Sequence, residues 1–285
     1  MMIGAGRSLA PLLEGPGVAR LVGARDPLTA ILAEQAGFDG VWVSSLETSA
    51  TRGLPDLGLL TMSECLAQAI EISKAVSVPS LVDCDTGYGG RINVRRTVRE
   101  FVAADAAGIC LEDKLFPKRN SFLDGTQAMM PCDEFAHVIE TAVSERGSHP
   151  LTVVARLESL VAGEGADDAL KRAHAYTDAG ADAILVHSKS SRPDDVAGFL
   201  VRWNRRRPAI VVPTTYHGWT ATEARNAGAS AVIYANHGLR ACVTALRSTF
   251  TRILQDDCTL RVDADIASVA EVLALTRTAD WEGRP

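Results

Sequence analysis

The sequence has few aromatic residues and no long apolar run. Phe, Trp and Tyr make up 5% of the 285 residues. No apolar stretch approaches the roughly 20 residues that a membrane-spanning helix needs, and the N-terminus lacks a signal-peptide core. The six cysteines contain no CxxC pair, so we expect free thiols in a reducing compartment. We therefore predict a cytoplasmic protein with no membrane partner.

The sequence also lacks an excess of positive charge. It has 29 Lys and Arg against 35 Asp and Glu, a formal net charge of -6 that argues against a nucleic-acid partner. An anionic small molecule remains possible, because a few positioned Arg and Lys side chains create the local field that it needs. The hydrophobic fraction of 47% is sufficient for a large core and argues against disorder.

A recurring unit is present instead, in which an Ala-Gly pair precedes a short apolar run. The pairs lie at 36–37, 107–108, 179–180 and 227–228, and the runs that follow them predict strands at 38–44, 109–112, 181–187 and 229–235. We interpret each pair as the end of a helix at a glycine C-cap, before a buried strand. Similar apolar runs predict four further strands, at 22–24, 80–83, 151–156 and 209–213.

Helical patterns separate these strands. They lie at 28–35 (after the start signal Asp26-Pro27), 62–76, 91–106, 133–146, 166–178, 193–205, 220–226 and 238–255. Eight alternating strands and helices predict an α/β fold, a (β/α)8 TIM-type barrel in a single domain over residues 1–285. A doubly wound open sheet is the alternative, disfavoured because no GxGxxG follows a strand and no GxxxxGK[ST] occurs.

Two further segments lie outside the repeating pattern. We expect an N-terminal helix over about residues 8–21, with its best pattern at 8–13 and a break at 15–17. We also expect a C-terminal helical extension over about residues 256–285, with a helix near 266–277. This extension exceeds what one barrel needs and favours packing on a partner subunit.

Polar and charged residues gather where the predicted strands end. Five strands end in such groups: Ser44-Ser45-Leu46-Glu47, Asp83-Cys84-Asp85, Glu112-Asp113, Arg156-Leu157-Glu158 and His187-Ser188-Lys189. One strand-end Asp could equally be structural. Five such strands are hard to explain by packing, because a buried charge is costly unless it is paired or bound to a metal. We therefore predict an active site at the carboxyl ends of the strands.

Three of these acids predict a metal site. Asp83 and Asp85 are separated by one residue, so their side chains point the same way from an extended backbone. With Glu112 on the next strand they offer hard oxygen ligands and three negative charges, which suits Mg²⁺, with Mn²⁺ as a possible substitute. Zinc is not expected, since no Cys/His set has suitable spacing.

Three other side chains are candidates for binding and catalysis. Arg156 and Lys118 are the natural anion binders, and Arg can grip a carboxylate or phosphoryl group with two N–H donors. His187 could act as an acid, a base or a hydrogen-bond donor.

Two motifs carry a resemblance to a known family. Asp83-Cys-Asp-Thr-Gly-Tyr-Gly89 and Glu112-Asp-Lys-Leu-Phe-Pro-Lys-Arg-Asn-Ser121 resemble the phosphoenolpyruvate mutases of the isocitrate lyase/phosphoenolpyruvate mutase superfamily. The likeness runs from about residue 24 to residue 254, and the second motif is highly specific. It implies a modified barrel whose last helix is swapped between subunits of a homo-oligomer, a dimer of dimers. It also implies Mg²⁺-dependent interconversion of phosphoenolpyruvate and phosphonopyruvate, the first step of phosphonate biosynthesis.

The resemblance implies a role for each matched residue. Asp85 would bind Mg²⁺ directly, with Asp83 and Glu112 acting through waters, and the amides around Ser45 and Leu46 would bind the substrate carboxylate. The groups around the phosphoryl group, which we take as catalytic or binding, would be Arg156, Lys118, Asn120, Ser121 and His187, with Asp56 close by. We also assign Trp42, Ser44 and Ser188 to the substrate-binding set. The loop 114–126 would close as a lid that excludes water.

The relatives within the superfamily differ at the loop. The C–C lyases carry a catalytic Cys in a K-[KR]-C-G-H loop, where this chain has Asn120-Ser121, so lyase chemistry is disfavoured. Phosphonopyruvate hydrolases usually have Thr at the position of Asn120, so Asn favours the mutase and leaves the hydrolase as the alternative. A non-catalytic anion-binding relative is disfavoured because the polar set is intact. Ser45, Cys84 and Tyr234 depart from the Gly, Ala and Trp common in the family.

Overall fold

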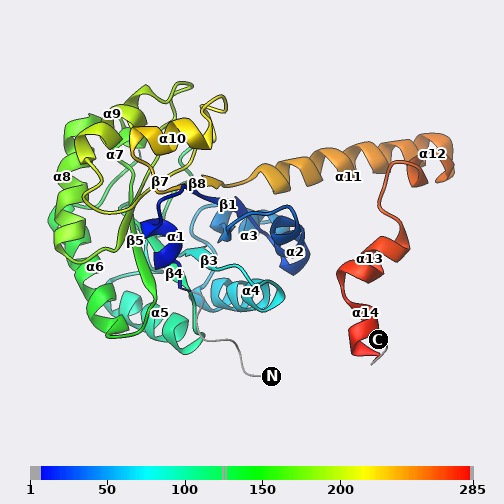
Figure 1. Ribbon diagram of the computed structural model, residues 1–285, viewed down its shortest axis with the longest axis horizontal. Helices are drawn as coiled ribbons and strands as arrows, with labels where there is room; N and C mark the ends of the chain where they lie inside the picture. The colour runs from blue at the N-terminus through cyan, green and yellow to red at the C-terminus, as the bar shows by residue number, and fades with distance from the viewer. Residues whose placement is uncertain (1–7, 124, 126, 283–285) are drawn as a thin grey trace. The chain divides into compact units, whose positions relative to one another are not determined.

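Eight parallel strands close into a barrel in the computed structural model, which describes residues 8–123, 125 and 127–282 (Figure 1). Each strand pairs with its neighbours in sequence order, and the last strand pairs with the first. The strands are β1 (Ala19–Gly23), β2 (Gly40–Val43), β3 (Ser80–Asp83), β4 (Gly108–Glu112), β5 (Thr152–Leu157), β6 (Ala183–Val186), β7 (Ala209–Val211) and β8 (Ala231–Tyr234). Their near-continuous burial is what parallel strands covered on both faces require. The predicted (β/α)8 barrel is confirmed.

Helices cover the outside of the barrel and begin at well-formed caps. They are α2 (Pro27–Gln35), α3 (Ser45–Thr51), α4 (Met62–Ala75), α5 (Arg91–Ala103), α6 (Cys132–Arg146), α7 (Ser159–Ala162), α8 (Gly165–Asp178), α9 (Asp194–Trp203) and α10 (Ala221–Ala227). Asp26 caps α2 by accepting from the Thr29 N–H at 2.7 Å. Thr61 and Glu64 form a capping box at the start of α4. The short α3 and α7 were not predicted from the sequence.

The barrel interior is a stack of inward-facing residues that changes from apolar to polar along each strand. Alternate residues of a strand face the same side. The interior cluster therefore contains Trp42, Leu81, Cys110, Val154 and Leu185, whereas their neighbours in the chain pack outward against the helices. Two residues beyond the apolar layer, the same inward phase continues into the polar groups at the carboxyl ends of the strands.

A short N-terminal helix, α1 (Ala10–Glu14), packs its apolar side into the barrel interior. Leu9 and Leu13 are buried in the same cluster as the inward-facing strand residues. The predicted helix over 8–21 is wrong in extent, because the helix ends at Gly15-Pro16-Gly17. Residues 19–21 instead belong to β1, where buried Ala19 and Leu21 alternate with exposed Arg20.

Three of the four predicted glycine C-caps have the backbone that this role requires. Gly37, Gly180 and Gly228 have φ of 88°, 103° and 121°, in the region that glycine tolerates best. The fourth prediction is wrong: α5 ends at Ala103, Asp105 takes the positive φ of 54°, and Gly108 is already the first residue of β4. A Cβ at Gly108 would lie 3.2 Å from the Thr152 carbonyl oxygen, so close strand packing is its role.

The chain divides into two compact units, the second of which is wholly helical. It begins at His237 and contains α11 (His237–Asp256), α12 (Leu260–Asp263), α13 (Val269–Leu275) and α14 (Thr278–Trp281). Many of its apolar side chains are exposed, among them Phe250, Leu254, Leu260 and Val269. None of the helices in the part of the chain described here combines the length and apolar character needed to cross a bilayer.

Candidate active site

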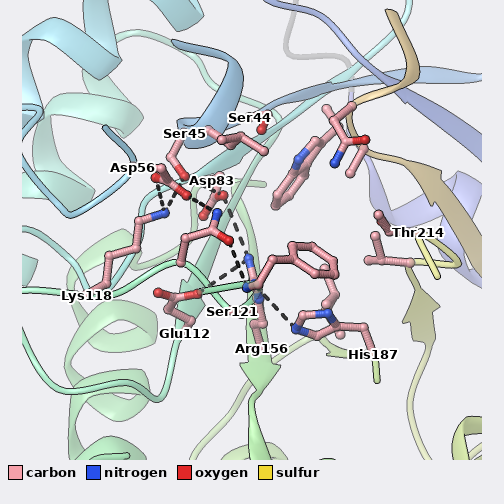
Figure 2. Close-up of a pocket in the computed structure, with 18 of the residues that line it drawn as sticks. Ser44, Ser45, Asp56, Asp83, Glu112, Lys118, Ser121, Arg156, His187 and Thr214 are labelled. Atoms are coloured by element: carbon pink, nitrogen blue, oxygen red, sulfur yellow. Dashed lines mark hydrogen bonds and ion pairs between the residues drawn. The ribbon is translucent and has the colours of Figure 1, made fainter. Parts of the chain in front are cut away.

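A cavity opens at the carboxyl ends of the strands, where the inward-facing stack becomes polar. Its lining unites side chains from strand ends with side chains from the loop after β4 (Figure 2). The lining residues are Trp42, Ser44, Ser45, Leu46, Asp56, Asp83, Glu112, Lys114, Lys118, Asn120, Ser121, Phe122, Arg156, Leu185, His187, Val212, Thr214, Ala235 and Asn236. Twelve of the fourteen predicted site residues are in this lining; Asp85 lies immediately beside it and Ser188 does not reach it.

The three predicted metal-binding acids lie together and are almost fully buried. Asp83 accepts a hydrogen bond from the Ser45 hydroxyl at 2.8 Å, and Asp85 contacts the Lys118 ammonium at 2.9 Å. Glu112 is 1% exposed, and among the described residues none donates a hydrogen bond to either of its carboxylate oxygens. Burial raises the pKa of Asp85 and raises that of Glu112 to about 7. Buried carboxylate oxygens without donors are what a hydrated cation would satisfy.

The donor chemistry of these acids fits magnesium rather than a metal caged by the protein. Over residues 8–123, 125 and 127–282, no three Cys, His, Asp or Glu side chains form a set that could hold a metal ion by themselves. Magnesium typically keeps several waters and binds one or two carboxylates together with the substrate. Asp85, Asp83 and Glu112 would hold the ion in that way, through carboxylate oxygens and water.

Lys118 joins the loop to these acids. Its ammonium lies 2.6 Å from Asp56, 2.9 Å from Asp85 and 2.8 Å from the Ser45 hydroxyl, and the residue is 5% exposed. Burial alone would lower the pKa of Lys118, but the surrounding carboxylates outweigh it and raise the pKa well above its ordinary value. The lysine is therefore a fixed positive charge inside the site.

Asn120 binds the same acid from the other side. Its amide N–H donates to Asp56 at 2.6 Å, and its carbonyl oxygen accepts from the Phe122 N–H at 2.9 Å. Asp56 thus anchors two groups of the loop, an ammonium and an amide. Asn120 is half-buried, because its hydrogen bond to Asp56 holds it in the site.

Arg156 faces three carboxylates from the end of β5. Its Nε donates to Glu158 at 2.6 Å, and its Nη1 lies 3.4 Å from Glu112 and 3.8 Å from Asp83. Burial opposes its charge, but Glu158 and the other acids outweigh this and raise the pKa of Arg156 well above its ordinary range. The guanidinium therefore stays charged and is positioned to bind an anion in the cavity.

His187 shares a carboxylate oxygen with Arg156. Its Nε2 lies 2.8 Å from Glu158 Oε1 and 3.3 Å from Arg156 Nη2. One ring nitrogen cannot both donate to the acid and accept from the guanidinium, so the shorter contact places the hydrogen on Nε2. Burial lowers the pKa of His187, with Glu158 opposing, and favours the neutral ring. Arg156 is then the main cation that, against burial, holds the pKa of Glu158 well below its ordinary value.

Lys114 and Glu158 are two buried charged groups that are not among the predicted site residues. Their charged ends lie 3.2 Å apart, and both contact the Ser121 hydroxyl, at 2.7 Å from Lys114 and 3.0 Å from Glu158. Lys114 also donates to the Arg119 carbonyl at 2.9 Å. Strand phase could have found them, because Glu112 and Lys114 share one face of the chain, as do Arg156 and Glu158.

Ser188 lies outside the cavity lining, unlike the other residues of the predicted substrate-binding set. It follows inward-facing His187, so its side chain takes the opposite phase and leaves the cavity. Its hydroxyl instead accepts from the Ser190 N–H at 3.1 Å and donates to Asp195 at 3.4 Å. The same alternation turns Asp113 outward, where it accepts from Tyr176 at 2.7 Å.

The fold and the cavity together define a class of protein. A (β/α)8 barrel carries its catalytic groups at the carboxyl ends of its strands. Here that end holds a buried acid cluster beside two fixed cations, Lys118 and Arg156, and the loop after β4 supplies part of the cavity lining. The chain is therefore a barrel enzyme for a small anionic substrate.

The family follows from sequence comparison. The model of the phosphoenolpyruvate phosphomutase family matches residues 9–254. The chain belongs to this family, within the isocitrate lyase/phosphoenolpyruvate mutase superfamily.

Solved structures and curated relatives agree with this assignment. A phosphoenolpyruvate phosphomutase structure from Streptomyces platensis subsp. rosaceus is 47% identical with a TM-score of 0.94, covering 96% of each chain. A phosphonopyruvate hydrolase from Variovorax sp. (strain Pal2) is 42% identical, and the match covers 88% of each chain. The structure of a phosphonopyruvate hydrolase complex with oxalate and Mg²⁺ is 38% identical with a TM-score of 0.90, covering 96% of this chain and 95% of that one.

Proposed function

We propose that this protein is a Mg²⁺-dependent mutase that interconverts phosphoenolpyruvate and phosphonopyruvate, the first step of phosphonate biosynthesis. The observation that carries the proposal is the loop geometry. Lys118 and Asn120 of the family loop both reach Asp56, and Lys118 also reaches Asp85 of the acid cluster. The loop thus completes a polar site that faces Arg156 and His187.

The reaction asks for positioning and for the exclusion of water. Phosphorus leaves the enol oxygen of phosphoenolpyruvate and bonds to C3, so an O–P bond breaks as a C–P bond forms, with no water consumed. A phosphoryl group in transit carries spread negative charge, which fixed cations and aligned donors stabilise. The site provides these in Arg156, Lys118 and the side-chain amide of Asn120, with the Ser121 hydroxyl, which donates to Glu158, beside them.

The substrate carboxylate would bind at the start of α3. Ser44 caps this helix by accepting from the Glu47 N–H at 3.3 Å. The N–H groups of Ser45 and Leu46, at the first two helical positions, have no carbonyl partner within the helix. Both residues line the cavity. Free N–H groups at a helix start favour an anion.

A magnesium ion would be held by Asp85, with Asp83 and Glu112 acting through waters. When bound, it would stabilise the negative charge of the pyruvate enolate. Support comes from the unsatisfied oxygens of Glu112 and from the related hydrolase structure described with oxalate and Mg²⁺. Mn²⁺, another hard cation, would be an acceptable substitute.

Phosphonopyruvate hydrolysis is the second candidate, because a hydrolase is 42% identical to this chain. Among the solved structures, the phosphomutase is more similar than the hydrolase, at 47% against 38% identity. Asn120 also favours the mutase. Lyase chemistry is disfavoured, because no cysteine is among the residues described as lining the cavity.

We also propose that the enzyme acts in the cytoplasm as a homo-oligomer, a dimer of dimers with exchanged C-terminal helices. The support is the helical second unit, whose Phe250 is 58% and Leu254 84% exposed. Light scattering of the full chain tests the oligomeric state: a monomer at micromolar concentration would contradict it.

The site is tested by thermal unfolding with Mg²⁺ and oxalate, a mimic of pyruvate enolate. We expect the two together to raise the melting temperature, and EDTA to cancel the rise. Turnover is tested by incubating the protein with phosphonopyruvate and Mg²⁺ and identifying the phosphorus products. Phosphoenolpyruvate supports the mutase, and inorganic phosphate alone supports the hydrolase.

A further inference from the structure

One carboxylate outside the cavity accepts hydrogen bonds from three groups that line it. Glu158 is fully buried and is not in the cavity lining. Its Oε1 accepts from Arg156 Nε at 2.6 Å and from His187 Nε2 at 2.8 Å, and its Oε2 accepts from the Ser121 hydroxyl at 3.0 Å. These three groups come from β5, from the end of β6 and from the loop after β4.

We propose that Glu158 is a positioning residue, which holds Arg156, His187 and the loop in the one arrangement that binds the migrating phosphoryl group. This inference rests on the proposed function, since it assigns the binding of the phosphoryl group to Arg156, with the side chains of His187 and Ser121 held beside the guanidinium. Glu158 makes no contact with substrate itself. It acts by fixing the direction of the Arg156 guanidinium, the tautomer of the His187 ring and the position of the Ser121 hydroxyl.

The contacts with Glu158 fix geometry as well as charge. Arg156 gives its Nε to Glu158, which leaves Nη1 and Nη2 for the cavity side. His187 gives its Nε2 hydrogen to Glu158, so the other ring nitrogen, Nδ1, carries a lone pair. Small displacements of such groups are costly, because a misplacement of about 1 Å can reduce turnover about 100-fold.

The alternative is a purely structural role, in which Glu158 only neutralises the charge of buried Lys114. The two are 3.2 Å apart, and Lys114 is 2% exposed, so removing the acid alone would leave a buried cation and could unfold the protein. The test must therefore separate the ion pair from the positioning role.

Substitution of Lys114 separates the two roles. Lys114→Met removes the cation. Adding Glu158→Met to this variant replaces the whole ion pair with two apolar side chains of similar volume, and such replacements of buried ion pairs are often neutral for stability. Glu158→Gln in the same background keeps one acceptor oxygen for Arg156 and His187. The three proteins are compared in kcat, KM, melting temperature and the stabilisation given by Mg²⁺ with oxalate.

We expect kcat to fall about 100-fold from Lys114→Met to Lys114→Met/Glu158→Met, with the oxalate-dependent stabilisation retained. The Gln version should recover about 10-fold of that loss, because its oxygen still accepts. A kcat within threefold of the Lys114→Met protein would overturn the proposal. Asp182→Asn is the control: it weakens a half-buried ion pair with Arg146 just before β6, at the opposite end of the strands, and should leave kcat unchanged.

Nitrogen NMR of the His187 ring makes the test independent of the reaction. In the wild type, Nε2 should carry the hydrogen and Nδ1 the lone pair, and the Glu158→Met change should mix the two tautomers. An unchanged tautomer would overturn the proposal. If the wild type releases phosphate instead of forming phosphoenolpyruvate, the proposed function fails, but the same ratio of rates still tests Glu158.

Discussion

The ammonium of Lys118 lies 2.9 Å from a carboxylate oxygen of Asp85, and both side chains are more than nine-tenths buried. One comes from the loop after β4 and the other from the end of β3. The pair shows that the acid cluster is balanced by a protein cation in this structure. A metal ion and the Lys118 ammonium would therefore compete for the same carboxylates.

This competition predicts opposite effects for the removal of Lys118. Lys118→Met should reduce kcat at least about 100-fold, because a fixed cation beside the phosphoryl group is lost. The same change should strengthen Mg²⁺ binding to the free protein, since the acids lose their competing charge. Calorimetric titration with Mg²⁺ measures this, with exposed Lys189→Met as the control. Weaker Mg²⁺ binding in the Lys118 variant would refute the competition.

Asp85 is predicted to be indispensable for the metal. Its φ of 49° lies in the left-handed region that Asn tolerates, so Asp85→Asn changes the charge without straining the backbone. We expect turnover below detection and no stabilisation by Mg²⁺ with oxalate. Asp105→Asn is the matched control, since Asp105 has a φ of 54° and lies before β4, away from the cavity. Wild-type turnover in the Asp85 variant would show that the ligand assignment is wrong.

Asn120 is predicted to matter for turnover more than for stability. Asn120→Ala removes the 2.6 Å hydrogen bond to Asp56, which is worth about 1 kcal/mol to the fold. The melting temperature should fall by only about 2–4 °C. We expect kcat to fall about 100-fold, because a misplaced group at the phosphoryl site is costly. A melting temperature lower by 10 °C or more with kcat unchanged would assign Asn120 a structural role.

Glu158 predicts a pH-dependent contribution to stability. Arg156 and His187 overcome burial and hold its folded-state pKa well below the ordinary 4.5. An acid with a depressed pKa contributes stability above its unfolded pKa and loses it as pH falls toward the folded value. Glu158→Gln should therefore cost about 3–5 kcal/mol of unfolding free energy at pH 7. That difference should shrink below pH 4.5 in urea titrations, and a difference constant from pH 7 to pH 3.5 would contradict the assignment.

The sequence predicted the barrel and the strand-end residues because both follow from local pattern. Apolar runs marked the strands, and charges after those runs marked the site. The alternation of side chains along a strand also predicts the orientation of three more residues. It directs Ser188 away from the cavity, because His187 faces into it, and it directs Lys114 and Glu158 inward. These corrections needed only the phase of each strand.

Contacts made by loops could not be predicted in this way. Asp56 and Asn120 are 64 positions apart, and no periodicity relates their loops, so only the folded chain shows their hydrogen bond. The glycine pattern failed at Gly108 for a related reason. An Ala-Gly pair can end a helix or begin a strand, and the close approach of Thr152 decides for the strand.

The central claim is that the phosphoryl group moves between oxygen and carbon of one small molecule. The most direct test is phosphorus NMR of the purified protein with phosphonopyruvate and Mg²⁺, followed over time. We predict that the phosphonopyruvate signal falls as a phosphoenolpyruvate signal grows mole for mole, and that EDTA stops both changes. Growth of inorganic phosphate without phosphoenolpyruvate would contradict the mutase and identify a hydrolase in spite of Asn120.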